Sequence, residues 1–234
     1  GTLRVTSALS SSNTGLLDAE EVMRRRVQDL IDDTWKDSTL DRDVSKAYRL
    51  EVIQVLKNTN DTLWTEYCKR REEVSLHYVK HLEDVKTVIP IWESGLEQAR
   101  LPSVNEFFLF HGTKPEAVSD ICKTGFSRES LSESAIFFSE SSVKADEYAQ
   151  DDRDGIYRGL FAMLLCRVTL GNPVINEVTP DVKEISRLLV AGGRHSIVDD
   201  RRKTLGTHRE FILQEARQVY PEFAVVYRRK AIRI

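Results

Sequence analysis

The stretch Phe107-Phe108-Leu109-Phe110-His111-Gly112-Thr113 is the part of this chain that decides its interpretation. Four large apolar residues in a row predict a buried strand, which a histidine and a glycine then follow. A glycine at this point lets a flat ligand lie against the backbone, whose N–H and C=O groups can both bond one primary amide. We expect the His111 ring to donate to a ligand hydroxyl while its other nitrogen is held by the protein. The alternative is a strand-end histidine packed in the core beside a turn glycine.

A second stretch places an aromatic ring on a short predicted helix. Tyr148 follows Lys144 by four residues, so both side chains lie on one helix face. A phenol held in this way can stack on an aromatic ligand, which contributes ~0.5–1.5 kcal/mol beyond area burial. Phe137, in the preceding apolar run 135–139, is the candidate for the opposite wall. The alternative is an amphipathic tyrosine that covers the core.

A third stretch, Glu210-Phe211-Ile212-Leu213, begins a predicted strand with a carboxylate. Glutamate is depleted in strands, and one at the mouth of a core strand needs solvent or a partner. Such a carboxylate can bond a sugar hydroxyl and stabilise positive charge that builds up as a leaving group departs from the sugar. It can also polarise an incoming nucleophile. The alternative is an ordinary surface residue at a strand end.

The rest of the chain predicts three segments: a flexible lead-in at 1–15, a helical N-terminal segment at 16–100, and a strand-rich domain at 101–234. The helical prediction rests on three apolar stripes: Met23, Val27, Leu30 and Ile31; Tyr48, Val52, Val55 and Leu56; and Leu63, Trp64, Tyr67 and Cys68, the last after a cap at Asp61. We expect strands near 106–111, 135–139, 160–170, 195–198, 210–214 and 222–228. Short helices are expected from Pro115 to Gly125 and from Ser141 to near Ala149. The fold class is therefore α+β, with helices packed on a mostly antiparallel sheet.

Composition restricts the function classes. With 34 basic and 37 acidic residues, the net charge is −3, which makes nucleic acid an unlikely partner for this fragment. Cys68, Cys122 and Cys166 are widely spaced, which predicts no disulfide framework, no metal site and an intracellular location, cytoplasmic or nuclear. No apolar run reaches the ~20 residues of a membrane span. Because the chain begins with Gly1, we expect an excised fragment.

The remaining histidines give weaker signals. His77 and His81 are one helical turn apart, a possible metal pair, but no third ligand is evident and a surface helix is the simpler interpretation. His195 is a weak candidate for lining a cleft, and His208 reads as a loop residue.

Taken together, residues 101–234 resemble the catalytic domain of the poly(ADP-ribose) polymerase family, the diphtheria-toxin-like ADP-ribosyltransferases. The matching elements are Leu109–Thr113, Ile121–Phe126, Ile136–Ser139, Lys144–Tyr148, Leu165–Val168, His195-Ser196, Arg209–Phe211 and Gln218–Phe223, with Asn60–Tyr67 similar to a lead-in segment of some members. The resemblance implies a split antiparallel β-sheet that grips NAD⁺ in a cleft, with inversion at the anomeric carbon. It implies no cofactor beyond NAD⁺ itself as the substrate.

The resemblance also implies a role for each matched residue. His111 would hold the adenosine-side ribose with Thr113 near it, Gly112 the nicotinamide amide, Tyr148 and Phe137 the nicotinamide ring, and Glu210 the nicotinamide ribose; residues 127–134 would cover the donor. Two positions depart from the family pattern. Ala145 replaces a common serine, so one hydrogen bond of typically ~0.5–1.5 kcal/mol is absent. Phe137 replaces a common tyrosine, and stacking survives that change.

The leading hypothesis is an NAD⁺-dependent ADP-ribosyltransferase that cleaves the nicotinamide–ribose bond and transfers ADP-ribose, as one unit or as polymer, to a protein acceptor or an existing ADP-ribose chain. Residues 183–200, on the acceptor side, do not decide between the two. One alternative is a module of the same fold that binds NAD⁺ or ADP-ribose without turnover. Another is a helical protein-interaction domain in which residues 16–99 act.

Overall fold

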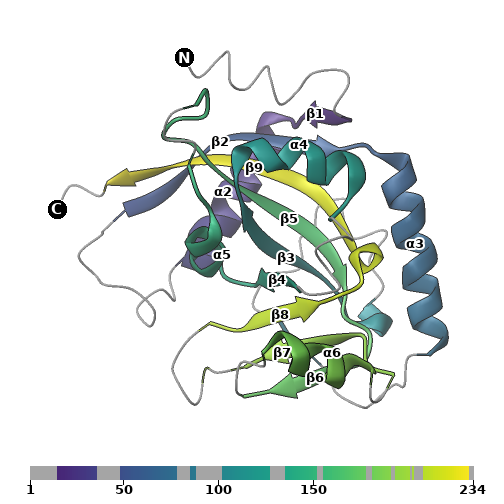
Figure 1. Ribbon diagram of the computed structural model, residues 1–234. Coiled ribbons are helices and arrows are strands. Elements are labelled where there is room, and N and C mark those ends of the chain that lie inside the picture. The colour runs from purple at the N-terminus through teal and green to yellow at the C-terminus, as the bar shows by residue number, and fades with distance from the viewer. Residues whose placement is uncertain are drawn as a thin grey trace.

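The structure is a computed structural model that describes residues 15–35, 48–77, 85–87, 102–126, 135–151, 155–177, 181–190, 193–200, 202 and 208–231. It is built around one large sheet with helices on both faces (Figure 1). The strands are β1 (Leu16–Asp18), β2 (Tyr48–Asn58), β3 (Glu106–Thr113), β4 (Ile136–Ser139), β5 (Phe161–Thr169), β6 (Pro173–Asn176), β7 (Ser196–Asp199), β8 (Glu210–Leu213) and β9 (Val219–Ala231). The helices are α2 (Glu21–Trp35), α3 (Asp61–Leu76), α4 (Pro115–Thr124), α5 (Ser142–Tyr148) and α6 (Val182–Val190), with 3₁₀ turns η2 (Pro102–Val104) and η3 (Ala216–Gln218).

The nine strands lie in the order β1-β2-β9-β5-β3-β4-β8-β7-β6, and every pair is antiparallel except β6 with β7. β3 pairs with β5 along its whole length, and β4 pairs with β8 along its whole length. Between β3 and β4, the described strand residues pair at one position, Phe110 opposite Ser139. The sheet is therefore split at this point into a five-stranded and a four-stranded part, and we call this junction the seam.

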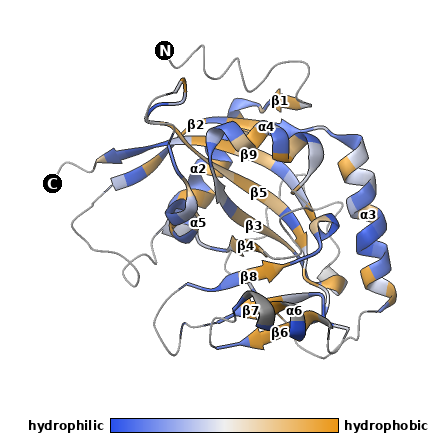
Figure 2. Cartoon of the chain, viewed as in Figure 1, coloured by the Kyte–Doolittle hydropathy of each residue, from blue (hydrophilic) through white to orange (hydrophobic). Residues whose placement is uncertain are grey.

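Strand alternation divides the core between the two faces of the larger part. Leu164 and Cys166 of β5 pack with α4 on one face, and Met163 and Leu165 pack with α2 and α5 on the other. All four side chains are fully buried. In Figure 2 the central strands are mostly hydrophobic while α3 is largely hydrophilic. The sheet thus supplies most of the apolar surface and fixes where α5 sits.

Helix α3 is held at one end of the central strands by a buried polar cluster. Tyr67 donates to the carboxylate of Glu106 at 2.6 Å, and Arg71 donates to the same oxygen at 2.9 Å. Arg167 lies between Glu222, to which its Nε donates at 2.8 Å, and the ring of Phe108. We call this group the Glu106 network. It docks α3 at the start of β3, far along that strand from His111.

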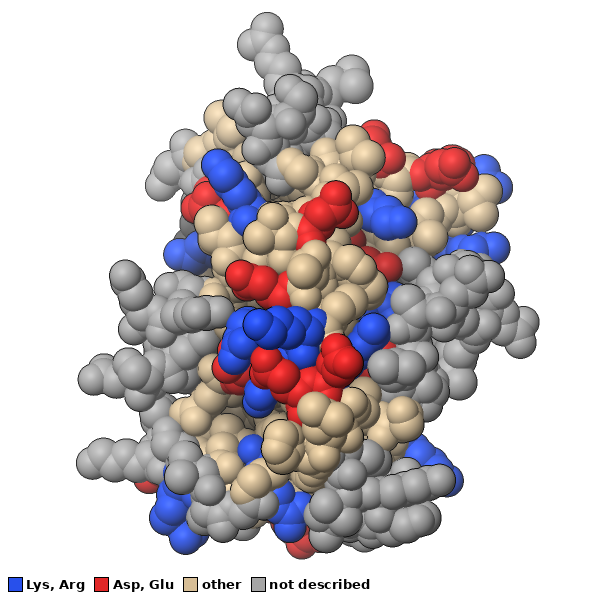
Figure 3. Space-filling view, turned by 90° about the vertical axis from the view of Figure 1, so that its right-hand side faces the viewer, with Lys and Arg blue, Asp and Glu red and all other residues tan. Residues whose placement is uncertain are grey.

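The outward side of α3 carries charges of both signs. Figure 3 shows basic and acidic side chains interspersed over the middle of this face. Arg70 pairs with Glu73 at 3.1 Å, and Arg217 of η3 pairs with Glu215 at 3.0 Å. Such partly exposed pairs contribute little to stability individually. Because the charges of opposite sign are paired, this face does not carry a strong electrostatic potential of one sign.

The fold class is confirmed: helices combine with a large, mostly antiparallel sheet. The strands expected after residue 103 and the two short helices are present with small shifts at their ends. One helical prediction is wrong, because Tyr48–Asn58 is a strand that pairs with β9. The expected division at residue 100 therefore cuts across the sheet, since β1 and β2 belong to the same sheet as the later strands. The cap of α3 is Asn60, not Asp61, and its side chain accepts from Leu63 N–H.

Two strands and one helix of the described residues were not expected: β1, β6 and α6. Of the helices in the described part of the chain, none has the length and apolar character needed to cross a membrane. The three cysteines are all free thiols. Burial raises the pKa of Cys122 to about 12 and that of Cys166 well above its ordinary value, so both stay protonated in the core.

Candidate active site

The candidate site lies at the seam. Phe110 of β3, Ser139 of β4 and Glu210 of β8 occupy one row across the sheet, because each is registered with the next. Residues in such a row point to the same face. Glu210 therefore faces the side on which Phe110 packs against α5. Beyond Phe110 no further pairs join the two strands within the described residues, and His111, Gly112 and Thr113 follow on β3 at this break in the pairing.

At Gly112 the backbones of β3 and α5 lie close together. A Cβ at this position would lie 1.9 Å from the carbonyl oxygen of Ala145 and 3.1 Å from the backbone nitrogen of Ala149. These are backbone atoms that cannot move aside without moving the helix. Only glycine fits this contact. Gly112 therefore sets the depth of α5 over the seam, a role additional to the ligand contact expected from sequence.

Tyr148 and Glu210 meet directly. The Tyr148 hydroxyl donates to Oε1 of Glu210 at 2.6 Å, the length of a charge-assisted bond to a carboxylate. Glu210 is buried, whereas 47% of Tyr148 is exposed. Lys144 lies 5.6 Å from the ring centroid and is itself paired with Glu147. The structure thus brings two of the three predicted catalytic residues into contact from elements 62 residues apart in sequence.

His111 is held by the strand across the seam. Its Nδ1 lies 2.9 Å from the carbonyl oxygen of Phe137, which can only accept, so Nδ1 carries the hydrogen. Burial lowers the pKa of His111, and the bond to Phe137 opposes this only in part. The ring is neutral at pH 7 and Nε2 is an acceptor. The expected contact with a ligand hydroxyl stays a prediction, but at this ring such a hydroxyl would donate to Nε2 instead of accepting from it.

Helix α5, which carries Tyr148, is anchored at both ends. At its N-terminus Ser142 Oγ donates to the carbonyl of Ile31 in α2 at 3.0 Å. Ser141 is the N-cap residue as expected, but its hydroxyl bonds Thr34 and does not cap the helix. These bonds tie the start of α5 to the end of α2.

Towards the C-terminus of α5, the fully buried carboxylate of Asp146 gathers three partners. Tyr227 donates to Oδ1 at 2.6 Å, Tyr48 donates to Oδ2 at 2.8 Å, and Arg229 Nε donates to Oδ1 at 3.0 Å. Burial, followed by the charge of Asp146, raises the pKa of Tyr227 well above its ordinary value, which keeps this phenol a donor. We call this group the Asp146 network. It fastens α5 to β2 and β9.

Glu210 is fixed from its own side by the residue before it. Arg209 makes a two-pronged ion pair with Glu140, at 2.7 Å from Nε and 2.9 Å from Nη2. Both side chains are buried. Ser139 Oγ donates to the Arg209 carbonyl at 3.1 Å. The start of β8 is therefore locked to the end of β4, and the carboxylate at its mouth has a defined position.

The other predicted ligand-binding residues lie near this site. Phe137 is half-buried against the small core of Ile185, Ile197 and Ile212, on the same face as Ser139 and Glu210 by alternation. Thr113 ends β3 opposite Ala162 and is half-buried. Stacking by Phe137 and ligand contact by Thr113 stay predictions. The expected covering loop, 127–134, lies outside the described residues.

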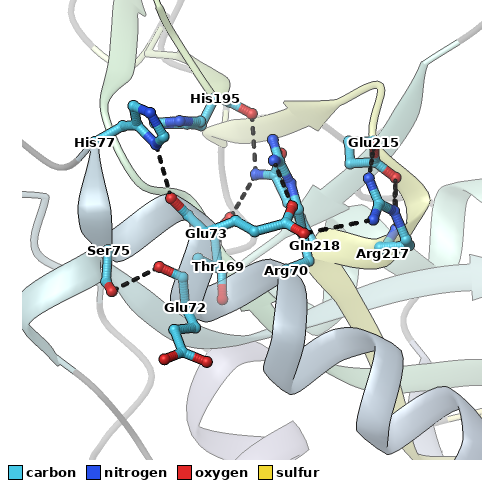
Figure 4. Close-up of polar contacts among 10 residues, drawn as sticks. All are labelled: Arg70, Glu72, Glu73, Ser75, His77, Thr169, His195, Glu215, Arg217 and Gln218. Carbon is cyan, nitrogen blue, oxygen red and sulfur yellow. Dashed lines mark hydrogen bonds and ion pairs between the residues drawn. The ribbon is translucent and has the colours of Figure 1, made fainter.

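Two of the remaining histidines, His77 and His195, lie in a separate cluster at the far end of α3. Figure 4 shows His77 and His195 side by side above Arg70 and Gln218. The His195 Nδ1 accepts from the Asn172 backbone N–H at 3.1 Å, and burial lowers its pKa to about 4. His195 therefore does not line the seam, and the weak expectation that it does is wrong.

His208 lies outside the helices and strands, next to Arg209, as expected for a loop residue, and it is buried. His81 lies outside the described residues. Among the residues that the structure describes, no group of three or more His, Cys, Asp or Glu side chains is arranged to hold a metal ion.

Sequence reasoning missed the residues that support the site: Asp146, Tyr48, Tyr227, Arg229, Glu140 and Arg209. Their partners lie 69 to 98 residues away in the chain, so no local pattern announces them. One signal was available, since an aspartate inside a predicted helix one turn from its C-terminal end opposes the helix dipole and calls for a compensating cation. That cation is Arg229.

The geometry supports a definite set of chemical tasks. A neutral imidazole acceptor, a partly exposed tyrosine and a buried carboxylate surround one break in the sheet. The set can bind a hydroxyl, stack an aromatic ring and stabilise positive charge on a sugar.

Comparison with models of known protein families gives a match over residues 32–187 to the poly(ADP-ribose) polymerase catalytic domain. The matched part runs from α2 into α6 and includes β2, His111 and Tyr148. Glu210 lies beyond its end but is joined to it by the pairing of β8 with β4 and by its bond to Tyr148. Since the match covers more than half of the chain, this protein belongs to the poly(ADP-ribose) polymerase catalytic domain family.

Proposed function

We propose that this chain is an NAD⁺-dependent ADP-ribosyltransferase that cleaves the nicotinamide–ribose bond and transfers ADP-ribose to a protein acceptor. The observation that carries the proposal is the 2.6 Å bond between the Tyr148 phenol and the Glu210 carboxylate at the seam, beside the fixed imidazole of His111. An intact trio of this kind supports turnover over silent binding, because each of its members has a task in the transition state or in donor binding.

The two faces of the sheet suggest how the dinucleotide lies. His111 contacts Phe126 and Phe138 on the α4 side, while Gly112 and the Tyr148–Glu210 pair lie on the α5 side. An NAD⁺ molecule threaded through the seam would place its adenosine ribose at His111 and its nicotinamide at Tyr148. A hydroxyl of that ribose would donate to His111 Nε2. This arrangement uses the break in pairing between β3 and β4 as the binding cleft.

In this proposal each residue has one chemical role. The nicotinamide stacks on the ring of Tyr148 and bonds the backbone near Gly112. Glu210 accepts from the 2′-hydroxyl of the nicotinamide ribose and stabilises the positive charge that develops as nicotinamide leaves. The acceptor then attacks the opposite face of the sugar, with inversion. Because Ala145 supplies no hydroxyl to the amide, affinity for NAD⁺ should be somewhat below that of members with serine there.

The proposal includes no metal and no cofactor beyond NAD⁺. In the proposal Glu210 also activates an acceptor hydroxyl, and the acceptor is either a protein side chain or an existing ADP-ribose chain. Transfer of one unit and transfer of polymer are both consistent with the retained glutamate. An intracellular site of action fits three free thiols.

Labelled NAD⁺ tests the proposal directly. The wild-type chain should release nicotinamide and retain label on protein, and Glu210→Gln should lower nicotinamide release by about 10²-fold or more. Glu21→Gln, which changes an exposed carboxylate on α2, is the matched control and should leave the rate unchanged. A single labelled band would indicate mono-transfer, and a ladder or smear would indicate polymer.

Other outcomes would select the alternatives. Tight NAD⁺ binding without nicotinamide release would favour a silent binding module. Absence of NAD⁺ binding would return attention to a protein-interaction role for residues 16–99. That role has less support than before, because β2 is an interior strand of the sheet and not part of a separate helical unit.

A further inference from the structure

Tyr148 stands at the end of a helix of seven residues, so its position depends on what holds that helix. A helix of this length has little stability of its own. We propose that Asp146, through Tyr48 and Tyr227, is a positioning residue that aims the Tyr148 ring at the nicotinamide end of the ligand. This inference rests on the proposed function and adds residues of β2 and β9 to the site.

The placement of Asp146 is unfavourable by local rules. It lies in the last turn of α5, where a carboxylate opposes the helix dipole. It is also fully buried, which is costly for a charge without compensation. Arg229 compensates both effects, because its Nε donates to Oδ1 and its Nη2 donates to the main-chain carbonyl of Asp146 at 2.8 Å. Because an apolar residue at this position would need no compensating arginine, we infer that the carboxylate of Asp146 has a specific role in the structure.

That role follows from helix geometry. Asp146 and Tyr148 are two residues apart and therefore about 200° apart around the helix axis. Asp146 points at β2 and β9, and Tyr148 points the other way, at Glu210. Around the helix axis, Ala145 lies between these two directions, and its carbonyl group contacts Gly112. Holding one side of α5 thus fixes the direction of the ring on its other side.

Directional bonds are needed for this purpose. Apolar packing would keep α5 on the sheet but would tolerate rotation about its axis. Hydrogen bonds from Tyr48 of β2 and Tyr227 of β9 to the two oxygens of Asp146 oppose this rotation. The arrangement also joins the site to Tyr48, which lies 98 residues earlier in the chain than Asp146.

Two ligands separate a positioning role from a structural one. Carba-NAD⁺ carries nicotinamide but is not cleaved, and ADP-ribose lacks the nicotinamide ring. Calorimetry should show that Tyr48→Phe and Tyr227→Phe each weaken carba-NAD⁺ about three- to tenfold, the usual value of one hydrogen bond, and change ADP-ribose less than about twofold. Tyr220→Phe is the control: it also loses one buried tyrosine hydroxyl, to the Asn58 carbonyl at 2.9 Å, but far from α5. It should change neither affinity.

Equal weakening of both ligands in Tyr48→Phe would overturn the inference, since it would indicate general loosening of the fold. So would unchanged carba-NAD⁺ affinity in both variants while the wild type binds. If the wild type bound neither ligand, the proposed function itself would fall, and the inference with it. Asp146→Asn should give a larger loss of carba-NAD⁺ affinity than either tyrosine variant; if this variant does not fold, the tyrosine variants decide the matter.

Discussion

Two buried carboxylates in this protein have nearly the same surroundings and support very different elements. Glu106 and Asp146 are both fully buried, each accepts from a tyrosine hydroxyl at 2.6 Å, and each pairs with an arginine at about 3 Å. The Glu106 network docks α3, which carries no residue of the candidate site. The Asp146 network docks α5, which carries Tyr148. Similar hydrogen bonding therefore stabilises the fold at Glu106 and orients Tyr148 at Asp146. The difference is that α5 carries a residue of the candidate site and α3 does not.

Replacement of Glu106 should give the largest effect on stability. Glu106→Gln leaves Arg71 and the nearby Arg167 with less compensating charge in the core, so we expect a loss of about 3 kcal/mol in the free energy of unfolding. Urea denaturation measures this loss, and the KM for NAD⁺ should stay within about twofold of wild type at temperatures where the variant is folded. Asp146→Asn is its counterpart and should lose both stability and NAD⁺ affinity. The comparison would break if the two variants shifted KM equally.

Tyr148→Phe tests the catalytic role of the residue that the Asp146 network positions. The substitution keeps the ring for stacking and removes the hydroxyl that donates to Glu210. Because this bond orients the carboxylate, kcat should fall about ten- to a hundredfold, with a smaller change in KM. Since Tyr148 is 47% exposed, the free energy of unfolding should change by less than about 1 kcal/mol. Steady-state nicotinamide release gives both kinetic constants. A rise in KM with unchanged kcat would instead assign the hydroxyl to ligand binding.

The smallest effect that we expect is a loss of stability at acid pH, caused by protonation of His195 near the end of α3. The pKa of His195 is lowered by burial to about 4, so the folded state favours the neutral ring. Its contribution to stability is complete above pH 6.5, its ordinary pKa, and is lost as the pH falls from 6.5 towards 4. We expect about 1 kcal/mol, allowing for its partial exposure. His195→Asn should show a shallower fall in stability over this range, and identical pH profiles would remove His195 as the cause.

The trio of the candidate site could be predicted from the sequence because each member sits in a short local pattern: an apolar strand ending at His111, a helix ending at Tyr148, and a strand beginning with Glu210. Their convergence came from the family resemblance and not from any one pattern. The hydrogen-bond direction at His111 could not be predicted, because it depends on the Phe137 carbonyl of another strand.

Two elements show why the rest was harder. Tyr48, Val52, Val55 and Leu56 have helical spacing, but they lie on an interior strand whose register shifts between Val52 and Gln54. The alternation of buried residues is interrupted there, and Val55 and Leu56 beyond the shift are both buried. Helix α6 had a readable start, since Asp181 accepts from the backbone of Glu184, three residues later. Short apolar patterns such as that of β2 do not by themselves distinguish a helix from a strand, whereas Asp181 is a helix-start signal from which α6 could be predicted.

The most direct test of the account is a crystal structure of this chain with carba-NAD⁺. The account predicts nicotinamide stacked on Tyr148, its ribose 2′-hydroxyl within hydrogen-bond distance of Glu210, and the adenosine ribose donating to Nε2 of His111, with the pyrophosphate passing between β3 and β4. Density for the dinucleotide at any site that leaves these three side chains without ligand contact would contradict it.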